Sequence, residues 1–167
     1  MRVKNYFTWA VLFLSLIMTE CSASKSLTKD ESTDAAELRK AIENRAFFVE
    51  VDKALPMGGS MRVLTSSYSL TVSGDSVKSH LPFFGRAYNV PYGGGDGLNF
   101  ESTVTEYQVS FDRKGKASIE FKTKSKEDQL EYRISIFTNG SASIDVTSVN
   151  RQPISFSGKA YPKKVEN

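Results

Sequence analysis

The chain has 167 residues and a formal net charge of +3, and 40% of its residues are hydrophobic. This length and composition indicate one folded domain and argue against disorder, and so small a positive charge does not indicate a nucleic-acid-binding protein. The single cysteine and single histidine exclude an intramolecular disulfide and a cysteine-rich zinc site. We therefore expect neither a metal ion nor a cofactor.

The N-terminus predicts an export signal over residues 1–20. Arg2 and Lys4 precede an apolar stretch over residues 6–18, after which small residues follow. This order is the pattern of a secretory signal peptide. The apolar stretch is shorter than the roughly 20 residues that a membrane-spanning helix needs.

Two cleavage positions are open. Cys21 stands where the apolar run ends, as the lipidated residue of a bacterial lipoprotein does, although Glu20 occupies a place that usually takes a small residue. Cleavage after Ala23, in the small-x-small sequence Cys-Ser-Ala, is the alternative. We favour lipidation at Cys21, because an unpaired thiol otherwise lacks a use in an exported protein. Residues 21–33 are then expected to form a polar tether.

The first element of the expected domain, residues 34–162, is a short helix. Leu38, Ala41 and Ile42 fall on one helical face, and Asp34 can cap the first turn. Residues 163–167 are expected to be a short tail.

Beyond the helix, apolar and polar residues alternate, which predicts half-buried antiparallel strands. Tight turns are expected at Gly74-Asp75, at residues 112–115 and at Asn139-Gly140. The fold class is therefore mainly β (α+β), an up-and-down antiparallel meander of about eight strands, curled or barrel-like, with one N-terminal helix. The expected inward faces are Phe47/Val49/Val51, Tyr68/Leu70/Val72, Val77/Ser79/Leu81, Tyr107/Val109/Phe111, Ala117/Ile119/Phe121, Leu130/Tyr132/Ile134/Ile136, Ala142/Ile144/Val146 and Ile154/Phe156/Gly158/Ala160.

Several phrases in this region resemble a known family. They are Leu-Pro-Met-Gly-Gly at 55–59, Tyr-Ser-Leu at 68–70, Gly-Asp-Ser-Val at 74–77, Leu-Pro-Phe-Phe-Gly-Arg-Ala-Tyr at 81–88 and Asn-Arg-Gln-Pro-Ile-Ser-Phe-Ser-Gly at 150–158. In this order they resemble the domain of unknown function 4251 family, exported and often lipid-anchored proteins of Bacteroides-type bacteria. The resemblance implies a shared fold and an envelope location, in the periplasm or at the outer membrane. It implies no activity and no catalytic residues.

Residues 81–100 form the candidate binding region. They make a long connection, rich in aromatic residues and glycine, between strands that are otherwise joined by short turns, and such connections are often functional. Arg and Tyr are favoured at binding hot spots, so the candidates for contact with a ligand or partner are Phe84, Arg86, Tyr88 and Tyr92. In a structural alternative, Phe83 and Phe84 plug one end of the barrel while Arg86 satisfies buried carbonyls.

Other patterns indicate no specific chemistry. The glycines at 93–97 lack the spacing of a phosphate loop, and Asp96 alone does not make a calcium loop. His80 should face solvent, and no Gly-x-Ser-x-Gly elbow is present, so no catalytic triad is expected. One hairpin carries lysines that could meet acidic glycans or lipid headgroups but more simply discourage edge-to-edge pairing: Lys114, Lys116, Lys122, Lys124 and Lys126.

The sequence thus predicts an exported, lipid-anchored envelope protein acting as a non-catalytic binding or structural module. The expected partners are the lipid membrane, through Cys21, and an unidentified envelope protein or glycan, but no nucleic acid. Two alternatives stay open: a carrier of a small apolar ligand inside a lipocalin-like barrel, and a glycan-acting enzyme with paired carboxylates.

Overall fold

The structure, a computed structural model, describes residues 27–89, 97–126 and 128–163. Tyr92 and Cys21 lie outside the described residues. Along the described part, one helix is followed by eight strands: α2 (Leu27–Glu43), β1 (Ala46–Pro56), β2 (Arg62–Ser73), β3 (Ser76–Leu81), β4 (Leu98–Phe111), β5 (Ala117–Lys124), β6 (Gln129–Ile136), β7 (Ser141–Ser148) and β8 (Ile154–Pro162). The barrel domain runs from Thr33 onward.

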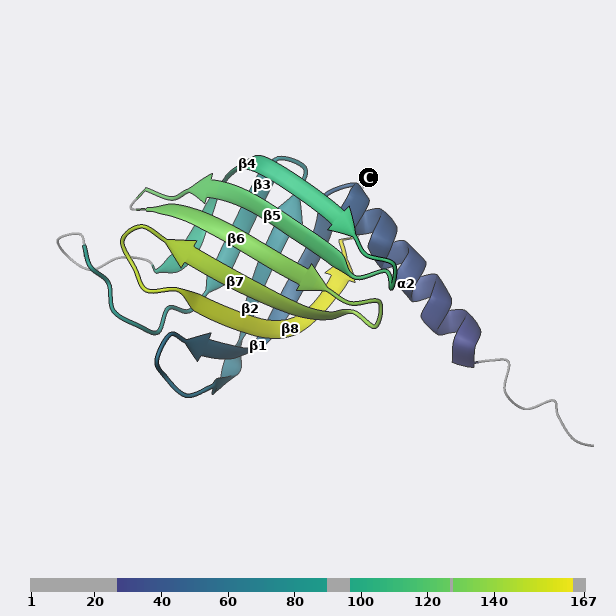
Figure 1. Ribbon diagram of the computed structural model, residues 1–167, viewed down its shortest axis with the longest axis horizontal. Coiled ribbons are helices and arrows are strands. Elements are labelled where there is room, and N and C mark those ends of the chain that lie inside the picture. The colour runs from purple at the N-terminus through teal and green to yellow at the C-terminus, as the bar shows by residue number, and fades with distance from the viewer. Residues whose placement is uncertain (1–26, 90–96, 127, 164–167) are drawn as a thin grey trace, which may run out of the picture. The chain divides into compact units, whose positions relative to one another are not determined.

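The strands form a closed antiparallel barrel (Figure 1). Each strand pairs with the next one in the chain, and β1 also pairs with β8. Both the mainly β class and the up-and-down order expected from the sequence are confirmed. Closure satisfies the backbone groups that an open meander would leave exposed at its two edges.

The core fills the inside of the barrel. Buried and exposed side chains alternate along β5, β6 and β7, as the period of two requires. Burial of one large apolar side chain contributes about 1.5–3 kcal/mol. The largest fully buried side chains include Phe47, Phe121, Tyr132 and Phe156.

Helix α2 lies against one end of the barrel with its apolar face inward. Leu38 and Ile42 are buried, as the helical spacing predicted, and Arg39 lies over the ring of Phe111 with its guanidinium carbon 3.9 Å from the centroid. The helix begins at Leu27 rather than near Asp34, so part of the segment expected as a tether is helical. Residues 27–33 contain neither Gly nor Pro, and nothing in them interrupts a helix.

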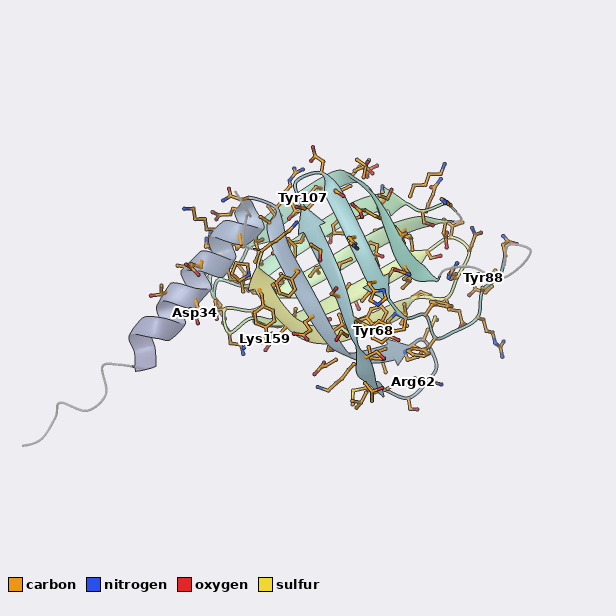
Figure 2. All side chains as sticks on the ribbon, turned by 180° about the vertical axis from the view of Figure 1, so that it is seen from behind. Asp34, Arg62, Tyr68, Tyr88, Tyr107 and Lys159 are labelled. Atoms are coloured by element: carbon orange, nitrogen blue, oxygen red, sulfur yellow. The ribbon has the colours of Figure 1, made fainter. Side chains whose placement is uncertain are left out.

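The connections divide the barrel into two ends. We call the turn end the one with α2 and the short connections at 74–75, 112–116 and 137–140. The loop end carries the residues at 57–61, 82–89, 125–126, 128 and 149–153. Figure 2 shows Tyr88 and Arg62 away from the end at which Asp34 lies.

Register shifts interrupt the regular ladder in β4 and in β1, and the one in β1 affects its pairing with both β2 and β8. In β4, Glu106 and Tyr107 stand opposite the single residue Phe121, and Glu106 has a φ of 52°. Between β1 and β2 the register jumps, because Val51 pairs with Tyr68 but Lys53 pairs with Val63. Bulges bend a strand and redirect its side chains.

Among the described residues, no helix has the combination of length and apolar character needed to cross a membrane.

Candidate functional site

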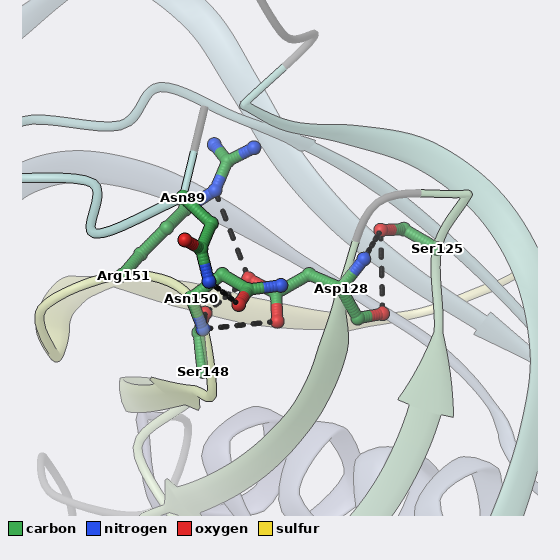
Figure 3. Close-up of polar contacts among 6 residues, drawn as sticks. All are labelled: Asn89, Ser125, Asp128, Ser148, Asn150 and Arg151. Carbon is green, nitrogen blue, oxygen red and sulfur yellow. Dashed lines mark hydrogen bonds and ion pairs between the residues drawn. The ribbon is translucent and has the colours of Figure 1, made fainter. Parts of the chain in front are cut away.

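A buried ion pair organises the loop end. Asp128 is 6% exposed and Arg151 is 7% exposed, and Arg151 Nε lies 3.7 Å from Asp128 Oδ2 (Figure 3). The carboxylate also accepts hydrogen bonds from the Ser148 hydroxyl and from the Asn150 backbone N–H, the latter at 3.3 Å. Asp128 in turn donates its own backbone N–H to Ser125 Oγ at 3.0 Å. Buried charges are tolerated when they are paired and hydrogen-bonded in this way.

The ion pair holds the 149–153 connection, and this connection holds the first part of the long loop. Gln152 N–H donates to the Arg86 carbonyl at 3.0 Å, and Arg86 N–H donates to Gln152 Oε1 at 3.1 Å. Tyr88 N–H donates to the Asn150 carbonyl at 2.7 Å, and Asn89 Nδ2 donates to Asn150 Oδ1 at 3.0 Å. The backbone that carries Arg86 and Tyr88 is therefore fixed in place before any partner binds.

The structure places the predicted site residues in three settings. Phe84 is half-buried, packs against the core and lies beneath Arg62, whose guanidinium carbon is 4.8 Å from the ring centroid. Arg86 and Tyr88 are exposed. Tyr92 is outside the described residues, so its part in the site stays a prediction.

The structural alternative holds for the two phenylalanines but not for Arg86. Phe83 and Phe84 both pack against the core at the loop end. The Arg86 side chain is exposed, and its described hydrogen bonds run through its backbone. Arg151 is the buried arginine of this end, with its guanidinium carbon 5.4 Å from the Phe83 ring centroid. Sequence reasoning missed Arg151 because its partner Asp128 belongs to a different connection.

Several large apolar side chains are exposed on the connections of the loop end and on the strand ends that lead into them. The β1–β2 hairpin reaches the 149–153 connection, where Met57 N–H donates to the Pro153 carbonyl at 3.3 Å. Extended exposure of large apolar side chains is typical of interaction surfaces. We call the following set the apolar collar, with exposed fractions given: Leu55 50%, Met57 62%, Met61 59%, Val63 69%, Tyr88 64% and Val149 70%.

The barrel interior is occupied by its own side chains. Phe121 stacks on Tyr132 with ring centroids 5.0 Å apart, and Phe156 is 1% exposed. Tyr132 donates its hydroxyl to Ser79 Oγ at 3.2 Å, and Ser79 donates to the Leu98 carbonyl at 2.6 Å. Burial raises the pKa of the Tyr132 hydroxyl above its ordinary value. The described interior side chains thus give the hypothesis of an apolar-ligand carrier no support.

The outer face of β4–β6 carries paired charges. Lys122 Nζ lies 2.5 Å from Glu106 Oε2, and this hydrogen bond raises the pKa of Lys122. Arg133 contacts Glu131 at 2.6 Å and Glu120 at 3.9 Å. Within the described ranges, no group of three His, Cys, Asp or Glu side chains is placed to hold a metal ion. These charges therefore form a solvated face of alternating sign.

His80 lies on the outside, as predicted. It is exposed, with its Nδ1 3.2 Å from Asn99 Oδ1 and its ring tilted against Tyr68 at 5.4 Å between centroids. Asn99 and Tyr68 come from the strands on either side of β3. This arrangement is a cross-strand surface contact.

Comparison with known proteins identifies the family. No curated protein shows significant sequence similarity to this chain. The chain resembles in fold a crystal structure of a DUF4251 family protein from Bacteroides eggerthii, with a TM-score of 0.62, 16% identity, and coverage of 80% of this chain and 91% of that chain. The model of the domain of unknown function (DUF4251) matches residues 29–160. Since that match covers most of the sequence, the chain belongs to the DUF4251 family.

Proposed function

We propose that the protein is an exported, lipid-anchored module of the cell envelope that binds another protein through its loop end, without catalysis. The observation that carries the binding function is the apolar collar, whose side chains are exposed at the end of the barrel where hydrogen bonds fix the backbone of residues 86–89. Interfaces between proteins draw on such surfaces, in which exposed Met and aromatic residues are enriched at the centre.

The collar favours a protein over a glycan as the partner. Leu55, Met57, Met61 and Val63 offer aliphatic surface, which suits apolar side chains of a partner better than it suits sugar hydroxyls. Arg86 and Tyr88 add the residue types that most often dominate interface energies.

The fixed backbone supports binding in a second way. Association is weakened when loops must be ordered as the complex forms, so a segment already held by hydrogen bonds loses less on binding. Asn150 and Gln152 hold residues 86–89 by hydrogen bonds. Both are chain neighbours of Arg151, which the buried ion pair with Asp128 keeps in position.

The lipid anchor rests on the position of Cys21 at the end of the apolar run. Mass spectrometry of the protein from its host envelope should find an acylated Cys21. A chain that begins at Ser24 without lipid would contradict the anchor.

The binding function is tested by photo-crosslinking in host envelopes. A photoreactive residue at Val149 should give a defined crosslinked protein, and one at Phe137, which is 49% exposed on the turn end, should not. Combining Arg86→Ala with Tyr88→Ala should abolish the Val149 crosslink while the melting temperature stays unchanged. Equal crosslinking from both positions, or an unaffected crosslink in the double variant, would overturn the proposal.

A further inference from the structure

Near its beginning at the loop end, strand β2 lacks part of the backbone pairing with β1 that its later residues have. Val63 pairs with Lys53 and Tyr68 pairs with Val51, so a single residue of β1, Asp52, spans the distance between these two pairs. Residues 64–67 therefore have no partner in β1 among the described pairings. The chain nevertheless stays extended here, since these residues belong to strand β2.

The other side of this segment is open as well. The pairing of β2 with β3 begins at Ser69 and His80, and β3 ends at Leu81. Pro82 follows, and proline has no N–H to donate to a neighbouring strand. Within the described pairings, residues 62–67 thus have no partner on the β3 side, and residues 64–67 have none on either side.

The composition of this edge differs from that of a protected one. Natural sheet edges are commonly blocked by charged residues, especially lysine, or by proline. Apart from Arg62, residues 62–67 contain neither a charged residue nor a proline, and of these residues only Leu64 is partly buried. Val and Thr favour the extended conformation, which keeps the edge in the form that a further strand can join.

We propose that residues 62–67 bind an extended, acidic segment of the partner protein by strand addition. The backbone N–H and C=O groups of the edge supply the hydrogen bonds, and the apolar side chains of Met61 and Val63 contact alternate side chains of the added strand. This inference rests on the proposed function and specifies how the partner of the loop end is held.

The positive charge around the edge determines the sign of the charge that the bound segment should carry. Lys53 forms an ion pair with Asp52, with Nζ 3.3 Å from Oδ2, so these two charges offset each other. Arg62 and Arg86 remain, with no Asp or Glu in residues 54–73 or 82–89, and Arg62 lies over the ring of Phe84, two residues before Arg86. A partner strand that carries carboxylates is attracted here, whereas a basic one is repelled.

The first test locates the segment that joins the edge. A photoreactive residue at Ser66 in full-length protein in host envelopes should crosslink one peptide with more acidic than basic residues. The same group at Asp145, which is exposed on β7 and pairs with Arg133 of β6 and Ser155 of β8, should give no such product. A basic segment, a second copy of this chain, or no crosslink at Ser66 would overturn the inference.

The second test separates backbone pairing from side-chain contact, with a synthetic peptide of the crosslinked sequence as the probe. Ser66→Pro removes an edge N–H and should weaken binding at least tenfold, and Ser66→Ala keeps that N–H and should change binding less than twofold. Thr65→Pro serves as the second variant if Ser66→Pro melts at a lower temperature. Equal binding by the folded proline and alanine variants would overturn strand addition.

Hydrogen exchange provides a readout that side-chain docking would not give. The amides of residues 64–67 should exchange fast in the free protein and become protected when the peptide is bound. Unchanged exchange at these amides in the saturated complex would overturn the inference. If the Val149 crosslink persists while Ser66 gives none, strand addition fails and the proposed function stands; loss of both crosslinks removes both.

Discussion

Arg45 lies over the ring of Tyr107, with its guanidinium carbon 4.3 Å from the ring centroid. The same guanidinium makes an ion pair with Asp75, with Nη1 2.7 Å from Oδ1. Arg45 follows the end of α2 and has a φ of 53°, while Tyr107 follows Glu106 in the β4 bulge. One side chain therefore joins the helix terminus, the β2–β3 turn and the bulge.

Arg45 affects the stability of the fold through its side-chain contacts and through its left-handed backbone. Two substitutions separate these contributions. Arg45→Ala should lower the free energy of unfolding by about 1–2 kcal/mol, since it removes the cation–π contact and a surface ion pair. Arg45→Gly removes the same contacts but fits the positive φ, so it should be more stable than the alanine variant by about 1 kcal/mol. Urea denaturation of both variants measures the difference, and equal stabilities would show that this backbone carries no strain.

Two tyrosines with buried hydroxyls should respond differently to loss of the hydroxyl. The Tyr107 hydroxyl is buried without a hydrogen-bond partner among the described residues, whereas Tyr132 donates to Ser79. Tyr107→Phe should therefore leave the free energy of unfolding unchanged or raise it by up to about 1 kcal/mol, and Tyr132→Phe should lower it by about 1 kcal/mol. Thermal unfolding of the two variants compares them directly. A larger loss from Tyr107→Phe would contradict this assignment.

The same tyrosines should make the protein sensitive to alkali. Burial raises the pKa of Tyr107 from 10.0 to about 12, with the charge of Arg45 opposing it, and burial also raises the pKa of Tyr132. Because the folded-state pKa values exceed the unfolded ones, this stabilisation is complete below pH 10 and is lost as the pH rises above it. Urea denaturation at pH 9 and 11.5 should show a decrease that is smaller in the Tyr107→Phe/Tyr132→Phe protein. An equal decrease in both proteins would assign it to other groups.

Removing only one member of the buried ion pair at the loop end should destabilise the protein more than removing both. Asp128→Ala or Arg151→Ala leaves an uncompensated buried charge and should lower the free energy of unfolding by about 3–5 kcal/mol. The double variant Asp128→Leu/Arg151→Met removes both charges and should lose less than either single variant. Denaturant titrations of the three proteins test this order, and additive losses would mean that the two charges do not interact.

Gly158 should be the least replaceable glycine of the barrel seam. A Cβ at this position would collide with the Glu50 carbonyl oxygen, because β8 passes very close to β1 there. Gly158→Ala should lower the free energy of unfolding by about 3 kcal/mol, at the upper end of the usual cost of overpacking. Gly59→Ala meets only Pro56 at 3.5 Å or more and serves as the control. Comparable melting temperatures for the two variants would show that the seam can widen freely.

The strands could be predicted from the sequence because alternation is a local signal. Ile119 and Phe121 point inward with charged residues between and after them, and Gly140 has the positive φ that the Asn-Gly turn requires. The β4 bulge is also visible in the sequence. The inward-facing residues of β4 have even numbers up to Val104 and odd numbers from Tyr107 onward. That change of phase was the available signal for an extra residue.

Local sequence patterns could predict neither the closure of the barrel nor the hydrogen-bond network at the loop end. Alternation does not encode which strand edges meet, so the pairing of β1 with β8 could not be deduced from it. The pairing of Asp128 with Arg151 depends on the meeting of two separate connections, and neither has a local pattern that marks the other. The β1–β2 register jump is equally nonlocal, because it places residues 64–67 opposite a single residue of β1.

The pairing of the first strand with the last has a consequence for the order of events during folding. Phe47 pairs with Pro162 and Pro56 with Ile154, so no earlier segment can complete the seam. Until β8 has paired with β1, the partly folded chain exposes two unsatisfied edges, which are templates for aggregation. Truncation before Ile154 should therefore yield an aggregating sheet, and a factor that shields unfolded chains should act until β8 has paired.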